Sequence, residues 1–445
     1  MTKQEAVRHV NILCLDVGST WTKAALLGPD GALLGTAQHP TTPPEVLTGI
    51  DAVTAALDAA GAEVLACSSA GGGLRLAVVG QERLVSAEAA YRVALSAGAK
   101  IVHVAAGELD GAGIRALRAS APDVLLLVGG TDGGETRVLA HNVARVAANR
   151  LRAPVVLAGN QDVRAAATDT LTAAGRTVIA TDNVLPDVGE LAPGPARAAI
   201  REMFLTHVIG GKGLSRGPRF RRLVRAVTPD AVLRGVAELA AVLADSESPG
   251  AVLVVDVGGA TTDVYSAVST VDELAGRSTV ELPPDRRTVE GDLGMRWSAP
   301  GVLAEATAER LIEPAEAAEL APKAEFRAAA VDWVPTDAED TAVDSRIAEL
   351  AAVIALRRHL RLVAGRLGPQ GVGLLVLSGG VFRHAGPERV AATVAALRAD
   401  SVLRPVLRNA RAVVDQRYVL APAGLLAEAG HTAAARTLLT STLAG

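Results

Sequence analysis

One short pattern occurs twice in this chain, about 240 residues apart, and it constrains the fold more than any other feature of the sequence. The two copies are LCLDVGSTWTKAALL at 13–27 and LVVDVGGATTDVYSA at 253–267. In each copy an apolar run leads into Asp-Val-Gly, hydroxyl side chains follow, and polar and apolar residues then alternate. This order predicts a buried strand, a tight turn and a returning strand. We therefore expect the chain to build the same local structure twice.

A strand that ends in Asp-x-Gly followed by Ser or Thr suits a phosphate site. The glycine lets a phosphate approach the main chain, while N–H groups and hydroxyls donate to its oxygens. The carboxylate stands where it can hold a hydrated Mg²⁺ that bridges the phosphates. One such turn alone is more often an ordinary strand end, and the second copy is what favours phosphate binding. The turn is not a P-loop, and GGKGLS at 210–215 is not one either, because no Ser or Thr directly follows its lysine.

A third segment, VLSGGVFR at 376–383, adds a glycine pair after another buried strand. Ser378, Gly379 and Gly380 would let a turn or a helix N-terminus pack closely against the adenosine of a nucleotide. A plain strand–turn–helix corner is the alternative interpretation. The order of the three segments along the chain favours the nucleotide interpretation.

Alternation of short Val, Leu and Ile runs with Ala-rich helical stretches predicts an α/β protein. A length of 445 residues predicts two or more domains. Between about 85 and 184, four expected strands with helices between them are enough for a small doubly wound unit, which we interpret as an insertion in the first domain. The Pro- and Gly-rich segment at 185–197 is a candidate linker.

Composition argues against several classes of partner. With 2% aromatic residues and a formal charge of -4, the chain offers neither a base-stacking platform nor a general attraction to phosphate backbones, so we expect no nucleic acid partner. No apolar window reaches the length of a membrane helix, and the N-terminus lacks the pattern of a signal peptide, so we expect no membrane contact. Cys14 and Cys67 lie in apolar runs, as reduced core thiols of a cytoplasmic protein do. The histidines occur singly, which argues against a zinc site.

The motifs carry a resemblance to known proteins. DVGSTWTK and DVGGATTD resemble the phosphate-1 and phosphate-2 motifs of the actin, sugar kinase and Hsp70 ATPase superfamily, and VLSGGVFR is similar to its adenosine motif. Five further blocks resemble the glutamate mutase accessory proteins, the MutL/GlmL family, which is unrelated to the mismatch-repair protein called MutL. These blocks are SSAGGGLRLAVVG at 68–80, LLVGGTDGGE at 126–135, VVLAGN at 155–160, HVIGGKGLS at 207–215 and TVEGDLGMRWSAPGV at 288–302.

The resemblance implies two actin-like ATPase domains of ribonuclease H-like fold around a nucleotide cleft, with the doubly wound α/β subdomain inserted in the first. We expect the first part of domain I at 1–84, the insertion at 85–190, the return to domain I with linker helices at 191–249, and domain II at 250–445. Each domain would supply one phosphate turn to a single ATP. This arrangement would explain why the pattern occurs twice.

The resemblance also implies a function. It is that of an ATP-binding, Mg²⁺-dependent ATPase that reactivates or chaperones an adenosylcobalamin-dependent mutase of the glutamate or methylaspartate mutase type. A small-molecule kinase of the same superfamily is the main alternative, although only Asp256 offers a general base. An actin-like filament protein is another alternative. So is an electron-transfer activator, for which Cys14 and Cys67 are badly placed to bridge an iron–sulfur cluster between subunits. Self-association is left open.

The expected site residues follow from the motifs. Asp16 is expected to contact a Mg²⁺-bound water, and Asp256 to orient the attacking water or join the metal's shell; both are the expected catalytic and metal-binding residues. The expected nucleotide-binding residues are Gly18, Ser19, Thr20, Lys23, Gly258, Gly259, Thr261, Thr262, Gly291, Ser378, Gly379 and Gly380. For Lys23, a solvent-facing position on an edge strand is the alternative.

Four further features of the sequence have a structural and a functional interpretation. Gly291 belongs to EGDLG at 290–294, which resembles an acidic turn near the ribose or phosphates in relatives. Glu238 is expected to be an exposed helical residue in preference to a water-polarising one. Gly133 and Gly134 are expected to form a tight loop and not an anion site. The basic run at 212–225 is expected to be a solvated face, with an acidic partner or a nucleotide contact through Lys212 as the alternative.

Overall fold

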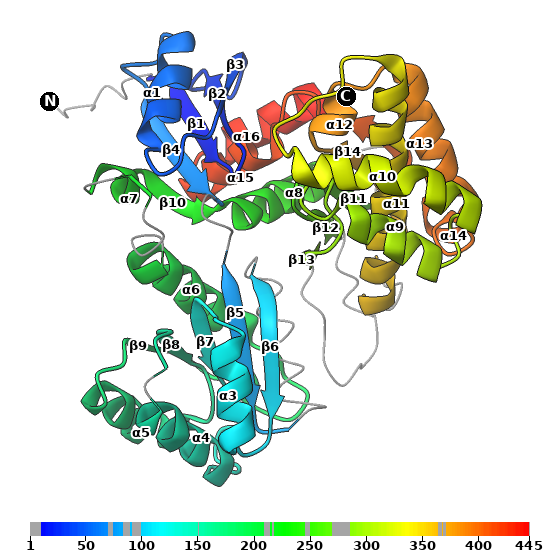
Figure 1. The fold of residues 1–445 in the computed structure, drawn as a ribbon. Coiled ribbons are helices and arrows are strands. Elements are labelled where there is room, and N and C mark those ends of the chain that lie inside the picture. Colours follow the sequence, from blue (N-terminus) through cyan, green and yellow to red (C-terminus); the bar gives the residue numbers. More distant parts are fainter. Residues whose placement is uncertain are drawn as a thin grey trace, which may run out of the picture.

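The computed structural model describes residues 10–69, 74–82, 90, 99–149, 151–208, 214–215, 218–244, 250–268, 285–363, 367 and 371–444, and these residues form three five-stranded sheets. Figure 1 shows two of the sheets in the upper half of the molecule, on either side of helices α8 (Thr228–Ala244) and α15 (Leu420–Glu428). The third sheet lies below them. We call the two upper parts the first and the second lobe.

The first sheet has the strand order β10-β4-β1-β2-β3. Its strands are β1 (Ile12–Val17), β2 (Trp21–Leu27), β3 (Leu33–Pro40), β4 (Glu63–Ser68) and β10 (Val224–Val227). Strand β1 runs antiparallel to β2 and parallel to β4. Side chains alternate along it: Leu13 and Leu15 pack on the outer face, which α1 (Leu47–Ala56) covers, and Ile12 and Cys14 pack on the inner face. Asp16 therefore lies on the inner face, toward the second lobe.

The second sheet repeats the first, with the order β13-β12-β11-β14-β15. Its strands are β11 (Ala251–Val257), β12 (Thr262–Ala267), β13 (Asp285–Glu290), β14 (Val372–Ser378) and β15 (Arg411–Val414). Strand β11 is again antiparallel to its hairpin partner and parallel to its other neighbour. The registers agree as well, since Asp16 pairs with Lys23 and Asp256 pairs with Asp263. The repeated sequence does build a repeated structure.

The third sheet is parallel throughout and has the order β6-β5-β7-β8-β9, that of a doubly wound fold. Its strands are β5 (Arg75–Gly80), β6 (Lys100–Ala106), β7 (Val124–Leu127), β8 (Val155–Leu157) and β9 (Val178–Ala180). Its helices are α3 (Gly111–Ala119), α4 (Arg137–Ala148), α5 (Gln161–Ala173) and α6 (Pro193–Met203). Strand β5 precedes residue 85, so this sheet begins earlier than the expected insertion, because β5 finds its partners only inside the inserted segment. The wider division into domains stays a prediction.

Helices α8 and α15 cross between the two lobes at a pair of glycines. A Cβ atom on Gly235 would lie 2.0 Å from the carbonyl oxygen of Leu420, and one on Gly424 would lie 1.8 Å from that of Ala231. The two backbones therefore touch directly. Together with α16 (Thr432–Leu439), these helices form one apolar cluster with the inner faces of both sheets, so the lobes share a core.

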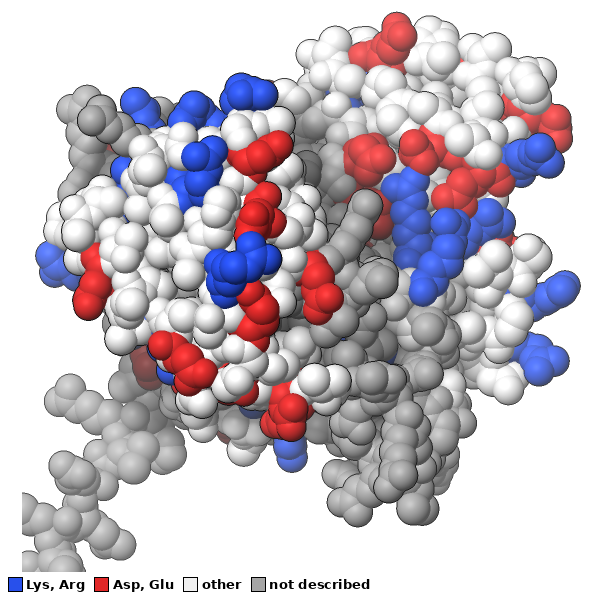
Figure 2. All heavy atoms as spheres, turned by 90° about the horizontal axis from the view of Figure 1, so that it is seen from below, with Lys and Arg blue, Asp and Glu red and all other residues white. Residues whose placement is uncertain are grey.

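The second lobe carries most of the remaining helices. They are α9 (Ala299–Ala308), α10 (Pro314–Ala329), α11 (Ala338–Leu362), α12 (Gly380–Arg383), α13 (Pro387–Ala399) and α14 (Arg404–Leu407). The short elements are α7 (Arg219–Leu223), η1 (Phe204–Val208) and η3 (Thr440–Ala444). The long helix α11 packs against β11, β12 and β13. Among the described residues, no helix has the length and apolarity needed to cross a membrane. On the face shown in Figure 2, basic and acidic side chains are interspersed.

Candidate functional site

The two Asp-x-Gly turns have the same hydrogen-bonded geometry. The N–H of Gly18 donates to the carbonyl oxygen of Trp21 at 3.0 Å, and the N–H of Gly258 donates to that of Thr261 at 2.9 Å. A Cβ atom on Gly18 would lie 2.8 Å from the carbonyl oxygen of Trp21, closer than side chains are found, and one on Gly258 would lie 3.0 Å from that of Thr261, which is a tight contact. Each hairpin thus closes tightly over its glycine, and Gly18 leaves no room for a side chain.

The hydroxyl residues of the turns are not equivalent. Ser19 and Thr20 are exposed at the tip of the first hairpin, where a phosphate could reach them. Thr261 is partly buried, and its hydroxyl donates to Asp263 at 3.2 Å. Thr262, expected in the second cradle, is fully buried in β12, and its hydroxyl donates to the carbonyl of Leu293. Strand alternation turns Thr262 inward, so it supports the turn from below.

Asp16 is buried and its carboxylate accepts three hydrogen bonds. Thr228, the first residue of α8, and Cys67 donate to Oδ1, and the hydroxyl of Tyr418 donates to Oδ2 at 3.0 Å. These donors come from the neighbouring strand β4, from the first turn of α8 and from the segment that leads into α15. Asp16 therefore links the first Asp-x-Gly turn to the junction of the lobes.

Asp256 occupies the equivalent place in the second lobe and is more accessible than Asp16. Burial raises the pKa of the Asp256 carboxyl to about 6, while the charge of Lys23 and a hydrogen bond from the Ser378 hydroxyl act in the opposite direction. Asp263 adds to the rise, but its own carboxylate is paired with the guanidinium of Arg287. Asp256 thus titrates just below neutral pH and feels a charge that belongs to the first lobe.

Tyr418 brings the two turns together. Its hydroxyl binds Asp16, and the ammonium nitrogen of Lys23 lies 3.4 Å from the centre of its ring, which is a cation–π contact. Burial, and then the charges of Asp16 and Asp256, raise the pKa of Tyr418. Both carboxylates therefore act on a single phenol. Lys23 does not lie on an edge strand, because its strand β2 pairs with β1 on one side and with β3 on the other. Its side chain points between the lobes, toward the ring of Tyr418.

Neither Tyr418 nor Thr228 belongs to any of the sequence motifs, and no pattern in the neighbouring sequence marks either residue. Tyr418 stands between β15 and α15, and Thr228 begins α8. Tyr418 has a φ of 54°, a left-handed conformation that is rare for a bulky residue. Such strain is found where the surroundings hold a side chain in place, as Asp16 and Lys23 do here.

The Ser-Gly-Gly segment lies beside the second turn. Ser378 is buried and pairs with Asp256 in the parallel strands β14 and β11. Gly379 has a φ of 112°, and a Cβ atom there would lie 2.3 Å from the carbonyl oxygen of Val257, so only glycine fits. Gly380 is exposed, with open space where a side chain would be. Of the pair, Gly380 is the one that a ligand could approach.

The EGDLG segment buttresses the second turn. The N–H groups of Met295 and Arg296, just beyond it, donate to the carbonyl oxygens of Gly258 and Gly259 at 3.0 and 2.8 Å. Gly291 accepts a bond from the Ser298 hydroxyl at 3.4 Å. The segment thus fixes the shape of the turn whether or not Gly291 also meets a nucleotide.

Glu238 was expected to be exposed, and this expectation is wrong. Its side chain is buried and makes ion pairs with Arg234 at 2.8 Å and Arg436 at 3.2 Å. Helix α16, distant in sequence, covers this face of α8. Glu238 therefore ties helices together and is not a candidate for polarising water.

The glycine pair at 133–134 and the described part of the basic run at 212–225 lie outside this site. Gly133 and Gly134 form a turn after β7, in which the N–H of Gly134 donates to the carbonyl of Thr131. In the basic run, Lys212 and Arg216 lie outside the described residues. Arg219 is exposed and makes an ion pair with Asp51 at 2.6 Å, as a solvated face would.

Within the described part of the chain, no group of three His, Cys, Asp or Glu side chains is placed to hold a metal ion. Mg²⁺ at nucleotide sites needs no such group, because it keeps several waters and takes one or two carboxylates together with phosphate oxygens. Asp256 fits that requirement better than Asp16, whose oxygens already accept three bonds. Cys14 and Cys67 are free and buried, and burial raises the pKa of both thiols.

Two lobes built on the same five-stranded sheet, each with an Asp-x-Gly hairpin at the same register, define a protein of the actin-like ATPase fold with a doubly wound insertion. The family model described as MutL protein matches residues 12–443, and the chain belongs to the MutL family. Protein MutL of Clostridium tetanomorphum is 33% identical over 446 residues, which cover 94% of this chain and 96% of that protein.

Solved structures give only distant matches. The ethanolamine utilization protein EutJ from Carboxydothermus hydrogenoformans is 10% identical, with 98% of this chain and 91% of that chain covered and a TM-score of 0.31. A ROK family glucokinase from Streptomyces griseus, in complex with glucose and AMPPNP, is 12% identical, with 98% and 100% covered and a TM-score of 0.31. The strand order of the two sheets, and not these matches, defines the fold.

Proposed function

We propose that this protein binds ATP with Mg²⁺ between its two phosphate turns, hydrolyses it, and acts as an accessory protein that reactivates or chaperones an adenosylcobalamin-dependent mutase. The partner class comes from the MutL family and its link to glutamate mutase. The proposal of ATPase activity rests on the geometry of the site.

One observation carries the ATPase proposal. The turns at Gly18 and Gly258 close with the same hydrogen bond, and Tyr418 binds the carboxylate of the first turn while its ring lies against Lys23, whose charge acts on Asp256 of the second turn. Two turns with the same backbone hydrogen bond, each with a carboxylate at the end of its strand, suit a ligand with several phosphates and a hydrated cation.

The side chains support distinct roles in hydrolysis. The exposed hydroxyls of Ser19 and Thr20 and the glycine N–H groups of the turns would bind phosphate oxygens. Asp256 would accept a hydrogen bond from the attacking water, for which it must be deprotonated. Lys23 would supply positive charge as negative charge shifts toward the leaving group. Bound Mg²⁺ would neutralise phosphate charge. Such a reaction needs positioning and electrostatic stabilisation and no covalent intermediate.

Coupling to a partner would use the junction of the lobes. Thr228 and Tyr418, both next to helices that cross between the lobes, bind the carboxylate of the first phosphate turn. A nucleotide that changes the position of Asp16 would therefore act on α8 and α15. The coupling requires that ATP binds one lobe arrangement better than the other.

The test measures phosphate release from ATP by the full chain alone, with small acids or sugars, and with a purified glutamate mutase holding inactive cobalamin. We expect release that the mutase stimulates, together with recovery of mutase activity. Stoichiometric phosphorylation of a small molecule would replace the proposal by the kinase alternative. Absence of both nucleotide binding and release would reject both functions.

A further inference from the structure

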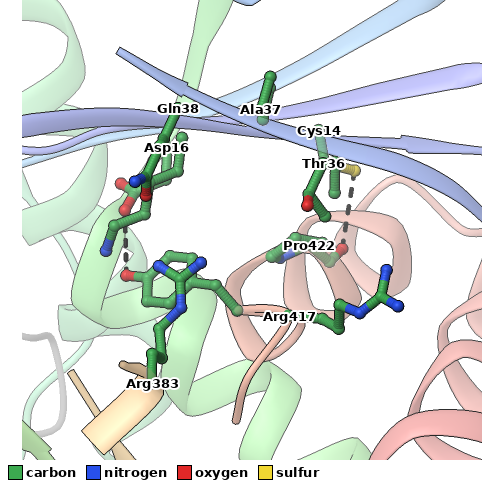
Figure 3. Close-up of a pocket in the computed structure, with 12 residues that line it drawn as sticks. Cys14, Asp16, Thr36, Ala37, Gln38, Arg383, Arg417 and Pro422 are labelled. Carbon is green, nitrogen blue, oxygen red and sulfur yellow. Dashed lines mark hydrogen bonds between the residues drawn. The ribbon is translucent and has the colours of Figure 1, made fainter. Parts of the chain in front are cut away.

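A pocket of about 230 Å³ opens between the first sheet and the second lobe, next to Asp16 (Figure 3). On one side, strand pairing aligns two rows of inner-face residues, Asp16–Lys23–Gln38 and Cys14–Ala25–Thr36. On the other side lie Arg383 of α12 and the segment that leads into α15. The pocket thus has one wall from each lobe.

Lys23 on one wall of this pocket and Arg383 on the other have no carboxylate partner among the described residues. Among the described residues, neither Lys23 nor Arg383 makes an ion pair within 4.0 Å, although Arg side chains elsewhere in the second lobe pair extensively. Lys23 lies over the ring of Tyr418, and the guanidinium carbon of Arg383 lies 5.8 Å from the centre of the same ring. Tyr418 therefore gathers one cation from each lobe.

Two of the nearby carboxylates, Asp16 and Asp415, accept hydrogen bonds from other partners, and Asp256 feels the charge of Lys23 without an ion pair within 4.0 Å among the described residues. The oxygens of Asp16 accept bonds from Thr228, Cys67 and Tyr418. Asp415 accepts the N–H groups that open α15, from Val419 at 2.9 Å and Leu420 at 3.5 Å. Among the described residues, the guanidinium of Arg383 makes one hydrogen bond, which its Nε–H donates to the carbonyl of Gln416 at 3.2 Å. Its terminal N–H groups stay available for an oxyanion.

We infer that Lys23 and Arg383 form a clamp for a phosphate group, with Arg383 as a phosphate-binding residue to which no motif assigns a role. A phosphate that bridges the two side chains would join the first sheet to α12 and hold the lobes together. The phosphate can belong to a bound nucleotide or be free inorganic phosphate. The nucleotide case rests on the proposed function, and the free phosphate case does not.

The second arginine of the pocket provides a matched control. Arg417 is exposed, and Figure 3 shows its guanidinium pointing away from Arg383. Arg417→Gln removes the same charge from the same pocket without touching the clamp. Arg383→Lys keeps the charge but loses the fork that binds two oxygens at once, and a thermal melt of each variant checks folding.

The experiment titrates the full chain with ATP, ADP and inorganic phosphate by calorimetry. We expect Arg383→Gln to weaken binding of the ligand that occupies the clamp by at least about tenfold, Arg383→Lys to weaken it less, and Arg417→Gln to change it by less than about threefold. A loss confined to ATP assigns the clamp to the nucleotide's terminal phosphate, and a loss for inorganic phosphate assigns it to the free ion. Folded Arg383→Gln that binds ATP and phosphate like the wild type would overturn the clamp but leave the ATPase proposal standing. Phosphate binding that depends on Arg383, in a protein that does not bind ATP, would support the clamp and reject the ATPase proposal. Wild-type protein that binds neither ATP nor phosphate would reject both the clamp and the ATPase proposal.

Discussion

The contact between Gly235 and Gly424 makes the junction of the lobes sensitive to a single methyl group. We consider Gly424→Ala in α15. The added Cβ atom would lie 1.8 Å from the carbonyl oxygen of Ala231 and 2.9 Å from the backbone nitrogen of Gly235. Both obstacles are main chain of α8, so no side chain can rotate away. The helices must separate by at least about 1 Å to reach an ordinary contact distance.

The size of the effect follows from two opposing terms. Alanine is a better helix former than glycine by about 1 kcal/mol, which would stabilise the variant. Overpacking a rigid contact costs about 1–3 kcal/mol or more, and separation of α8 from α15 also loosens the apolar cluster that both lobes share. We expect a net loss of about 2 kcal/mol in the free energy of unfolding.

Gly194→Ala is the matched control, since Gly194 is also helical and a Cβ atom there would meet no atom within 4 Å. This control should be neutral or stabilised by up to about 1 kcal/mol. Denaturant unfolding of the full chain, followed by circular dichroism, compares the two variants with the wild type. Equal stability of the Gly424 and Gly194 variants would refute the direct contact of the two helices.

Four further predictions concern the site and the second lobe. Phosphate release should rise as the pH passes about 6, because the Asp256 carboxyl must lose its proton to accept a hydrogen bond from water. The release should be largely lost in Asp256→Asn. A rate of release that is flat from pH 5 to about 7.5 would contradict this role of Asp256. Since the folded-state pKa of Asp256 is raised from 3.8 to about 6, its ionisation costs stability progressively as the pH rises between these values, and the full cost remains above about 6; Asp256→Asn should therefore gain thermal stability relative to the wild type at pH 8 but not at about pH 4. Arg327→Met should destabilise by about 3 kcal/mol in denaturant, because Arg327 is fully buried against carboxylates of α11. Lys323→Met, at an exposed pair, should leave the unfolding midpoint nearly unchanged, and similar losses in the two variants would argue against the buried network. Tyr418→Phe keeps the ring beneath Lys23 but removes the bond to Asp16, and should cost about 1–3 kcal/mol in the same assay; an unchanged midpoint would show that this bond contributes little.

The hairpins could be predicted from the sequence because everything that forms them is local. Two apolar strands joined by a glycine turn fix their own register, and the same register appears in both lobes. The tight closure over Gly18 and Gly258 follows from a contact only three residues away. The α/β class and the presence of a doubly wound unit were likewise visible in the order of apolar runs.

The surroundings of the hairpins were decided by contacts that the linear order does not reveal. Tyr418 reaches Asp16 across 402 positions, and Glu238 is buried because a helix 198 positions further along covers it. Strand β5 joins the inserted sheet because only partners from the insertion complete its hydrogen bonds. A sequence pattern states which side chains share a strand face, whereas the packing of distant elements decides what that face meets. For this protein, local chemistry determined the two Asp-x-Gly turns, and the packing of α8 and α15 between the lobes determined that Asp16 of the first turn binds Thr228 and Tyr418.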